Sequence, residues 1–132
     1  MKTIVITGST RGIGFALARE FLKRDCQVVI SGRSDSSVKN SIEKLGLEYP
    51  QDQVVGFPCD VTQYDQIVAL WEFSKKKYGN IDIWINNAGI SNGQAPSWEV
   101  PVDEIRSVIE TNMLGELFGT KVAMQGFLDQ GF

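Results

Sequence analysis

Residues 1–14 read MKTIVITGSTRGIG, a short apolar run followed at once by a loop that contains three glycines. The β-branched run over 3–7 predicts a buried strand, and apolar residues recur at helical spacing directly after the loop. The glycines therefore stand where a strand gives way to a helix. Gly8 permits the sharp turn off the strand, Gly12 lets the backbone come near a ligand, and Gly14 lets the helix pack closely on the sheet.

A loop of this kind predicts an anion site, because the first N–H groups of a helix lack partners and the helix dipole favours negative charge. A pyrophosphate fits such a site best. We therefore expect the loop to bind a dinucleotide through Gly8, Ser9, Thr10, Arg11, Gly12, Ile13 and Gly14. The spacing is GxxxGxG rather than GxGxxG, and an ordinary tight turn is the alternative.

Runs typical of strands alternate with stretches of helical period along the whole chain. Strands are expected at 3–7, 27–31, 53–57 and 81–85, with helices between them and a long helix over about 102–129. The strands are apolar without clean alternation, which indicates a parallel sheet covered by helices on both faces. The predicted fold class is α/β, a Rossmann-type doubly wound parallel sheet, forming one domain over 1–132. Because a fourth crossover helix should lead to another strand, we expect this domain to be incomplete, the N-terminal part of a protein roughly twice as long.

The composition excludes several classes of function. The chain has 132 residues, a formal net charge of -3 and one short basic run, 75–77, interpreted as the solvated face of a helix, which argues against nucleic-acid binding. It has no histidine, so a zinc site is nearly excluded, and we expect Cys26 and Cys59 to be buried free thiols. No apolar stretch is long enough to span a membrane and no signal peptide precedes the first strand, so a cytoplasmic protein is expected.

The choice of cofactor depends on the residues after the second predicted strand. A carboxylate there would bind the ribose 2′-hydroxyl of NAD, whereas an arginine accommodates the 2′-phosphate of NADP. The first charged residue after this strand is Arg33, and Arg11 is available from the glycine loop. A guanidinium suits a phosphate dianion, so we expect NADP(H), with NAD(H) as the alternative cofactor. Asp35 is interpreted as a helix cap, and a solvated loop charge is the alternative for Arg33.

Three segments together resemble the short-chain dehydrogenase/reductase family: the glycine loop, the pair Asp60-Val61 after the third predicted strand, and Asn86-Asn87-Ala88-Gly89 after the fourth. The resemblance covers the whole chain, about the first half of a typical member. The stretch IDIWINNAG at 81–89 is further similar to the branch that includes chlorophyll b reductases.

The resemblance implies roles for individual residues. Arg33 and Ser34 match the positions that hold the 2′-phosphate, Asp60 and Val61 the pair beside the adenine, and Asn87, Ala88 and Gly89 the motif that borders the ribose. Asn112 matches the asparagine of the catalytic tetrad, which holds a water in a proton relay by bending its helix. From the residues alone, Asp60 could instead be a cap or turn carboxylate, Asn86-Asn87 turn formers, and Asn112 a satisfied core amide.

The family's catalytic serine and YxxxK pair are not found. None of Tyr49, Tyr64 and Tyr78 is followed four residues later by lysine, so we expect these groups beyond Phe132 and no activity from this stretch alone. The expected function is that of an NADP(H)-dependent oxidoreductase that reduces a carbonyl or oxidises an alcohol by hydride transfer. A non-catalytic dinucleotide-binding sensor or regulatory protein is the alternative, and a phosphate-binding signalling module is a third class.

The apolar pattern of the last predicted helix indicates a protein partner in addition to the small-molecule substrate. Its apolar residues cover more than one face: Met113, Leu114, Leu117, Phe118, Val122, Met124, Phe127 and Leu128. Gly115 and Gly119 would let another backbone approach. Members of the family commonly pair through this helix, so a homodimer or homotetramer is expected. Alternatively, the second face packs on further parts of the same sheet.

Overall fold

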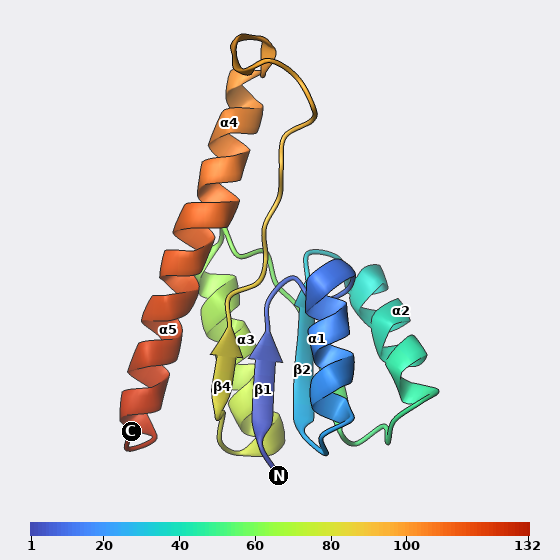
Figure 1. Ribbon diagram of the computed structural model, residues 1–132. Helices are drawn as coiled ribbons and strands as arrows, with labels where there is room; N and C mark the ends of the chain where they lie inside the picture. Colours follow the sequence, from blue (N-terminus) through green and yellow to red (C-terminus); the bar gives the residue numbers. More distant parts are fainter.

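The strands lie side by side in a parallel sheet with the order β3-β2-β1-β4 (Figure 1). A computed structural model describes all of residues 1–132. Its strands are β1 (Thr3–Ile6), β2 (Gln27–Gly32), β3 (Val54–Pro58) and β4 (Ile83–Ile85). Its helices are α1 (Gly12–Leu22), α2 (Asp35–Gly46), α3 (Tyr64–Tyr78), α4 (Val102–Ile109) and α5 (Gly115–Asp129), with the 3-10 helix η1 (Ser97–Glu99) and the π-helical turn η2 (Glu110–Leu114). The predicted doubly wound α/β fold is confirmed.

Both faces of the sheet are buried, which explains why its strands lack alternation. In β1 and β2, Ile4, Ile6 and Ile30 face one core, where they pack with residues of α1 and α2. Val5 and Val29 face the other core, which α3 and α5 cover. All five side chains are 0% exposed. Because successive side chains of a strand point to opposite faces, each strand supplies both cores.

The fourth strand is shorter than expected. It begins at Ile83 rather than Ile81, although Ile81 is fully buried. The side chain of Gln130 explains the difference: its amide donates to the Ile81 carbonyl at 2.9 Å and its oxygen accepts from the Ile81 N–H at 3.1 Å. The backbone of Ile81 is thus satisfied by a side chain from beyond the end of α5 instead of by a neighbouring strand.

The long C-terminal helical region is continuous but not uniform (Figure 1). The π-helical turn η2 separates α4 from α5, in agreement with the local bend expected around Asn112. None of the residues of α4 is buried, and this helix extends past the carboxyl ends of the strands. The helix ends before Gly131, whose φ of +93° fits the predicted glycine C-cap.

The glycines of this region allow close packing within this chain. A Cβ on Gly115 would lie 2.7 Å from a methyl of Val61, and one on Gly119 would collide with the side chain of Asn86. At Gly115 the expected approach of another backbone is confirmed, because the Val61 carbonyl oxygen lies 3.4 Å from the position of such a Cβ. At Gly119 the nearest atoms are side-chain atoms of Asn86 and Trp84 instead. The reason is that α5 packs on α3 and on the side chains of Val61, Trp84 and Asn86, where small residues allow a close approach.

Much of the other face of this region is open to solvent. Met113, Leu117, Met124 and Leu128 are all exposed, so the apolar residues do cover more than one face.

None of the helices combines the length and the apolar character needed to traverse a bilayer. Cys59 is buried, whereas Cys26 is only half-buried, and both are free thiols.

Candidate functional site

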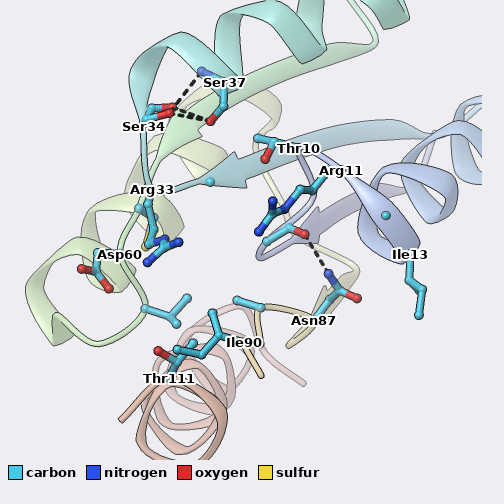
Figure 2. A pocket seen from close by; sticks show the side chains of 17 residues that line it. Thr10, Arg11, Ile13, Arg33, Ser34, Ser37, Asp60, Asn87, Ile90 and Thr111 are labelled. Carbon is cyan, nitrogen blue, oxygen red and sulfur yellow. Dashed lines mark hydrogen bonds between the residues drawn. The ribbon is translucent and has the colours of Figure 1, made fainter. Parts of the chain in front are cut away.

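A pocket of about 750 Å³ opens at the carboxyl ends of the strands, where ligands bind in open parallel sheets. Figure 2 shows side chains from the glycine loop, the start of α2, the segment after β3 and the loop after β4 around one space. The predicted residues that line it are Gly8, Thr10, Arg11, Gly12, Ile13, Arg33, Ser34, Asp60, Val61, Asn87, Ala88 and Gly89. Ser9, Gly14 and Asn112 lie outside its lining.

The glycine loop carries a row of free N–H donors, and all but the last of them belong to residues that line this pocket. The N–H groups from Thr10 to Gly14 donate to no backbone carbonyl, since they precede or open the first turn of α1. The first turn of α1 carries no acidic side chain that would satisfy them. Gly12 has a φ of +58°, and a Cβ there would stand in open space. These donors and the helix dipole together form a cradle for an anion.

Close packing explains the other two glycines of the loop. Gly8 has a φ of +60°, and a Cβ on it would lie 2.6 Å from the Cα of Ala88. A Cβ on Gly14 would lie 2.5 Å from the amide nitrogen of Asn87 and from the Gly8 carbonyl oxygen. Gly14 thus allows α1 to approach the loop itself and Asn87, whereas the sequence predicted close packing of this glycine on the sheet.

Ser9 is a structural residue rather than a ligand of the pocket. Its side chain is fully buried, and its hydroxyl donates to the Ile6 carbonyl at 2.6 Å. The same oxygen accepts from the Ser31 N–H at 2.9 Å, while the Ser9 N–H donates to the Ser31 carbonyl at 2.7 Å. The side chain of Ser9 therefore fastens the loop to β1 and β2, and only its backbone belongs to the turn.

Asn87 fastens the loop from the opposite side. Its amide donates to the carbonyls of Thr7 at 3.1 Å and Gly8 at 2.8 Å. In return, the Thr7 hydroxyl accepts from the N–H groups of Asn87 at 3.0 Å and Ala88 at 3.1 Å. Asn86 points elsewhere, to the indole of Trp84. The two asparagines are thus more than turn formers, and Asn87 couples the loop after β4 to the glycine loop, as Figure 2 shows.

The segment after β3 supplies a carboxylate and a thiol. One oxygen of Asp60 accepts from the Thr62 N–H at 3.0 Å and from its hydroxyl at 2.8 Å, so the turn role is confirmed. The residue also lines the pocket and has a second oxygen for a ligand. Beside it, burial raises the pKa of Cys59 to about 12, assisted by the charge of Asp60. This thiol stays protonated and is a packing group.

Two guanidinium groups border the pocket without an acidic partner. Arg11 and Arg33 are exposed and point into the same space in Figure 2, and the ion pairs of the protein involve other residues. Ser34, the N-cap of α2, accepts from the Ser37 N–H at 3.2 Å. The expectation that Asp35 caps this helix is wrong, since Asp35 is its first residue and pairs with Lys39 at 2.8 Å.

Asn112 occupies the π-helical turn, and both polar atoms of its side chain bind the backbone of Ile90. Its oxygen accepts from the Ile90 N–H at 2.8 Å, and its nitrogen donates to the Ile90 carbonyl at 2.7 Å. The residue is exposed, so it is not a core amide. It holds the loop after β4 against η2, next to Thr111, which does line the pocket.

Five residues of the lining were not predicted from the sequence: Gly32, Ser37, Cys59, Ile90 and Thr111. Four of them stand next to residues that were expected, so adjacency to a motif was the available signal. Ser37 stands one helical turn beyond the predicted Ser34, where only the helix geometry brings it to the rim.

The sequence profile of the family described as short chain dehydrogenase matches residues 2–132, and the chain belongs to this family. Among curated proteins it is 43% identical over 129 residues to the chloroplastic chlorophyll(ide) b reductase NOL of Arabidopsis thaliana, covering 96% of this chain and 36% of that protein. It is 33% identical over 129 residues to 3beta-hydroxysteroid dehydrogenase 1 of Eggerthella lenta, covering 98% of this chain and 49% of that protein. The predicted similarity to chlorophyll b reductases is thereby confirmed.

Solved structures agree with the fold. ElxO with NADP bound matches with a TM-score of 0.85 and 34% identity, covering 94% of this chain and 49% of ElxO. The chain spans between 27% and 49% of the length of the curated relatives. The names of the relatives describe oxidoreductases. The pocket of this chain lies at the carboxyl ends of the strands, which is the end of an open parallel sheet where ligands bind.

Proposed function

We propose that this chain binds NADP(H) and forms the cofactor-binding part of an oxidoreductase that interconverts a carbonyl and an alcohol. One observation carries the proposal: residues with free N–H groups and two arginines without acidic partners line one pocket. The donors suit a pyrophosphate, and the guanidinium groups suit a further phosphate. ElxO, a structure similar to this chain, is described with NADP bound, which supports a nicotinamide dinucleotide.

The preference for NADP(H) rests on the residues directly after β2. Gly32 is buried against Thr10, and Arg33 is the first side chain that reaches the pocket. Asp35 could receive the 2′-hydroxyl of NAD, but its carboxylate is paired with Lys39. A 2′-phosphate would meet Arg33 and the hydroxyls at the N-terminus of α2, which donate and carry no negative charge.

When bound, the nicotinamide supplies the hydride, and the protein positions it. Asp60 and Val61 would border the adenine, the glycine loop the pyrophosphate, and the backbone of 87–89 the nicotinamide-side ribose. Asn112 would act by fixing Ile90 and the π-helical turn, because both polar atoms of its side chain already bind Ile90. The substrate is proposed to be a small-molecule carbonyl or alcohol, as the relatives' names suggest.

Titration of intrinsic fluorescence with NADPH and NADH tests the proposal. The variant Arg33→Asp should weaken NADPH binding by at least about tenfold and NADH binding by less than about threefold. Arg106→Asp is the matched control, since Arg106 is exposed on α4 and outside the pocket lining. Equal losses for both cofactors would remove the NADP(H) preference, and no binding of either cofactor to the parent chain would remove the proposed function.

We further propose self-association through α5 in the form of a homodimer or homotetramer. The support is the row of exposed apolar side chains on this region, Met113, Leu117, Met124 and Leu128. Light scattering should give a mass above that of one chain, and Leu117→Glu should reduce it to the monomer value. A parent chain that is monomeric at high concentration would contradict this.

A further inference from the structure

We propose that Ser41 is a positioning residue for the cofactor, through a hydrogen bond that links α2 to the glycine loop. This inference rests on the proposed function and deepens it. Ser41 lies in the second turn of α2 and is 3% exposed. Its hydroxyl donates to the Thr10 carbonyl at 3.0 Å, 31 residues away in the chain. No motif of the sequence marks it.

The acceptor of this hydrogen bond distinguishes Ser41 from other buried serines in helices. A buried serine within a helix commonly donates to the carbonyl four residues earlier. Ser74 does so in α3, where its hydroxyl donates to the Leu70 carbonyl at 2.7 Å. Ser41 instead crosses to another element and holds a residue that lines the pocket.

Because of the geometry of the peptide group, the hydrogen bond from Ser41 to the Thr10 carbonyl also orients the next N–H group. In a trans peptide the C=O of Thr10 and the N–H of Arg11 lie in one plane and point in opposite directions. Holding the Thr10 carbonyl toward α2 therefore turns the Arg11 N–H away from α2. This N–H is one of the free donors of the anion cradle. Ser41 thus fixes the orientation of a donor that it does not touch.

The same helix carries the other phosphate subsite. Ser34 and Ser37, at the start of α2, line the pocket beside Arg33. The helix is held to the sheet by buried Val38 and Leu45, so it does not depend on Ser41 for its place. Ser41 consequently ties the pyrophosphate cradle to the 2′-phosphate subsite and keeps the distance between them constant.

A cofactor that occupies both subsites at once gains more affinity from this fixed distance than a cofactor that occupies a single subsite. NADPH has the extra phosphate and NADH does not. Loss of the Ser41 hydroxyl should therefore weaken NADPH binding by about tenfold and NADH binding by about threefold or less. A serine that only stabilised the fold would change neither affinity.

The test compares Ser41→Ala with Ser74→Ala, which removes a buried hydroxyl and one hydrogen bond outside the pocket lining. Both variants should unfold at lower urea concentration, and only Ser41→Ala should lose NADPH affinity. Ser41→Cys keeps the volume but donates weakly, so it should show the same loss if the alanine variant does not fold. Ser41→Thr, which restores the hydroxyl, should recover affinity.

Three results are decisive. Parent-like NADPH affinity in both Ser41→Ala and Ser41→Cys would overturn the inference and leave the proposed function intact. Equal fold-losses for NADPH and NADH would overturn the link between the two subsites. A parent chain that binds neither cofactor would overturn the proposed function, and this inference would fall with it.

Discussion

Replacing Asn87 by alanine should destabilise the fold and the pocket together. The amide of Asn87 donates to the carbonyls of Thr7 and Gly8 at 3.1 and 2.8 Å, where the end of β1 meets the glycine loop. Thr7 is only 2% exposed, so water cannot easily replace the lost donor. Gly14 also packs against this amide, so loss of the Asn87 side chain would leave a gap beneath α1.

The expected loss can be worked out from these contacts. Each hydrogen bond contributes about 1 kcal/mol net, and a buried acceptor left without a donor costs about 1–3 kcal/mol. The free energy of unfolding should therefore fall by about 2–4 kcal/mol, which is a large part of the roughly 5–15 kcal/mol typical of a small domain. NADPH affinity should fall as well, because Asn87 holds the loop that carries the free N–H donors.

Two further variants test whether burial or the number of lost hydrogen bonds determines the loss of unfolding free energy. Asn86→Ala also removes two side-chain hydrogen bonds, to Trp84 and Thr120, but Asn86 is exposed and water can substitute. Its cost should stay below about 1 kcal/mol. Asn87→Asp keeps the shape and replaces the donor by a carboxylate oxygen facing two carbonyls, so it should cost more than alanine.

Urea unfolding followed by tryptophan fluorescence measures all three variants, and the same samples serve for NADPH titration. The order of stability should be Asn86→Ala, then Asn87→Ala, then Asn87→Asp as the least stable. If Asn86→Ala costs as much as Asn87→Ala, burial is not what gives the Asn87 hydrogen bonds their strength. If Asn87→Asp equals the parent chain, the hydrogen bonds assigned to the amide are wrong.

Other substitutions test the packing and the titration of the site. Gly126→Ala should destabilise by more than about 2 kcal/mol, because a Cβ would lie 2.0 Å from the Trp71 ring. A Cβ on Gly46 would make only an ordinary contact with Gln51 at 3.7 Å, so Gly46→Ala should stabilise by up to about 1 kcal/mol, and urea midpoints distinguish the two variants. An added Cβ at Gly12 meets no neighbour, but the φ of +58° should cost about 1 kcal/mol of strain in Gly12→Ala. Calorimetry should show a roughly tenfold loss of NADPH affinity in this variant, and an unchanged affinity would contradict the proposed anion cradle. Cys59 has a folded-state pKa raised to about 12 from 9.0, so the unfolded chain loses its proton first and stability should fall between these values as pH rises. The difference in unfolding free energy between the parent and Cys59→Ala should shrink by about 1–2 kcal/mol from about pH 8 to about pH 10.5, and a constant difference would show that the thiol is not shielded.

Local chemistry explains why the fold could be predicted from the sequence. Burial on both faces, helical spacing and glycine at a strand-to-helix turn are properties of short segments. They indicated the parallel sheet, the ligand site at its carboxyl end, and the part of the lining that the glycine loop and Arg33 supply. The resemblance to the family supplied six further lining residues: Ser34, Asp60, Val61, Asn87, Ala88 and Gly89. The start of β4 was misplaced because the partner of Ile81, Gln130, is 49 residues away in the chain, and no local pattern carries that information.

Residue type and nearest neighbours were enough to predict the class of fold, the position of the glycine turn and the pair of arginines beside the pocket. The pairing of side chains from different elements was settled in the folded molecule alone. Ser9 turns inward, Gly119 admits Asn86, and Ser41 reaches the loop. The physical reason is that hydrogen bonds and close packing act over about 3–4 Å between atoms of different elements, and those distances exist only once the helices rest on the sheet.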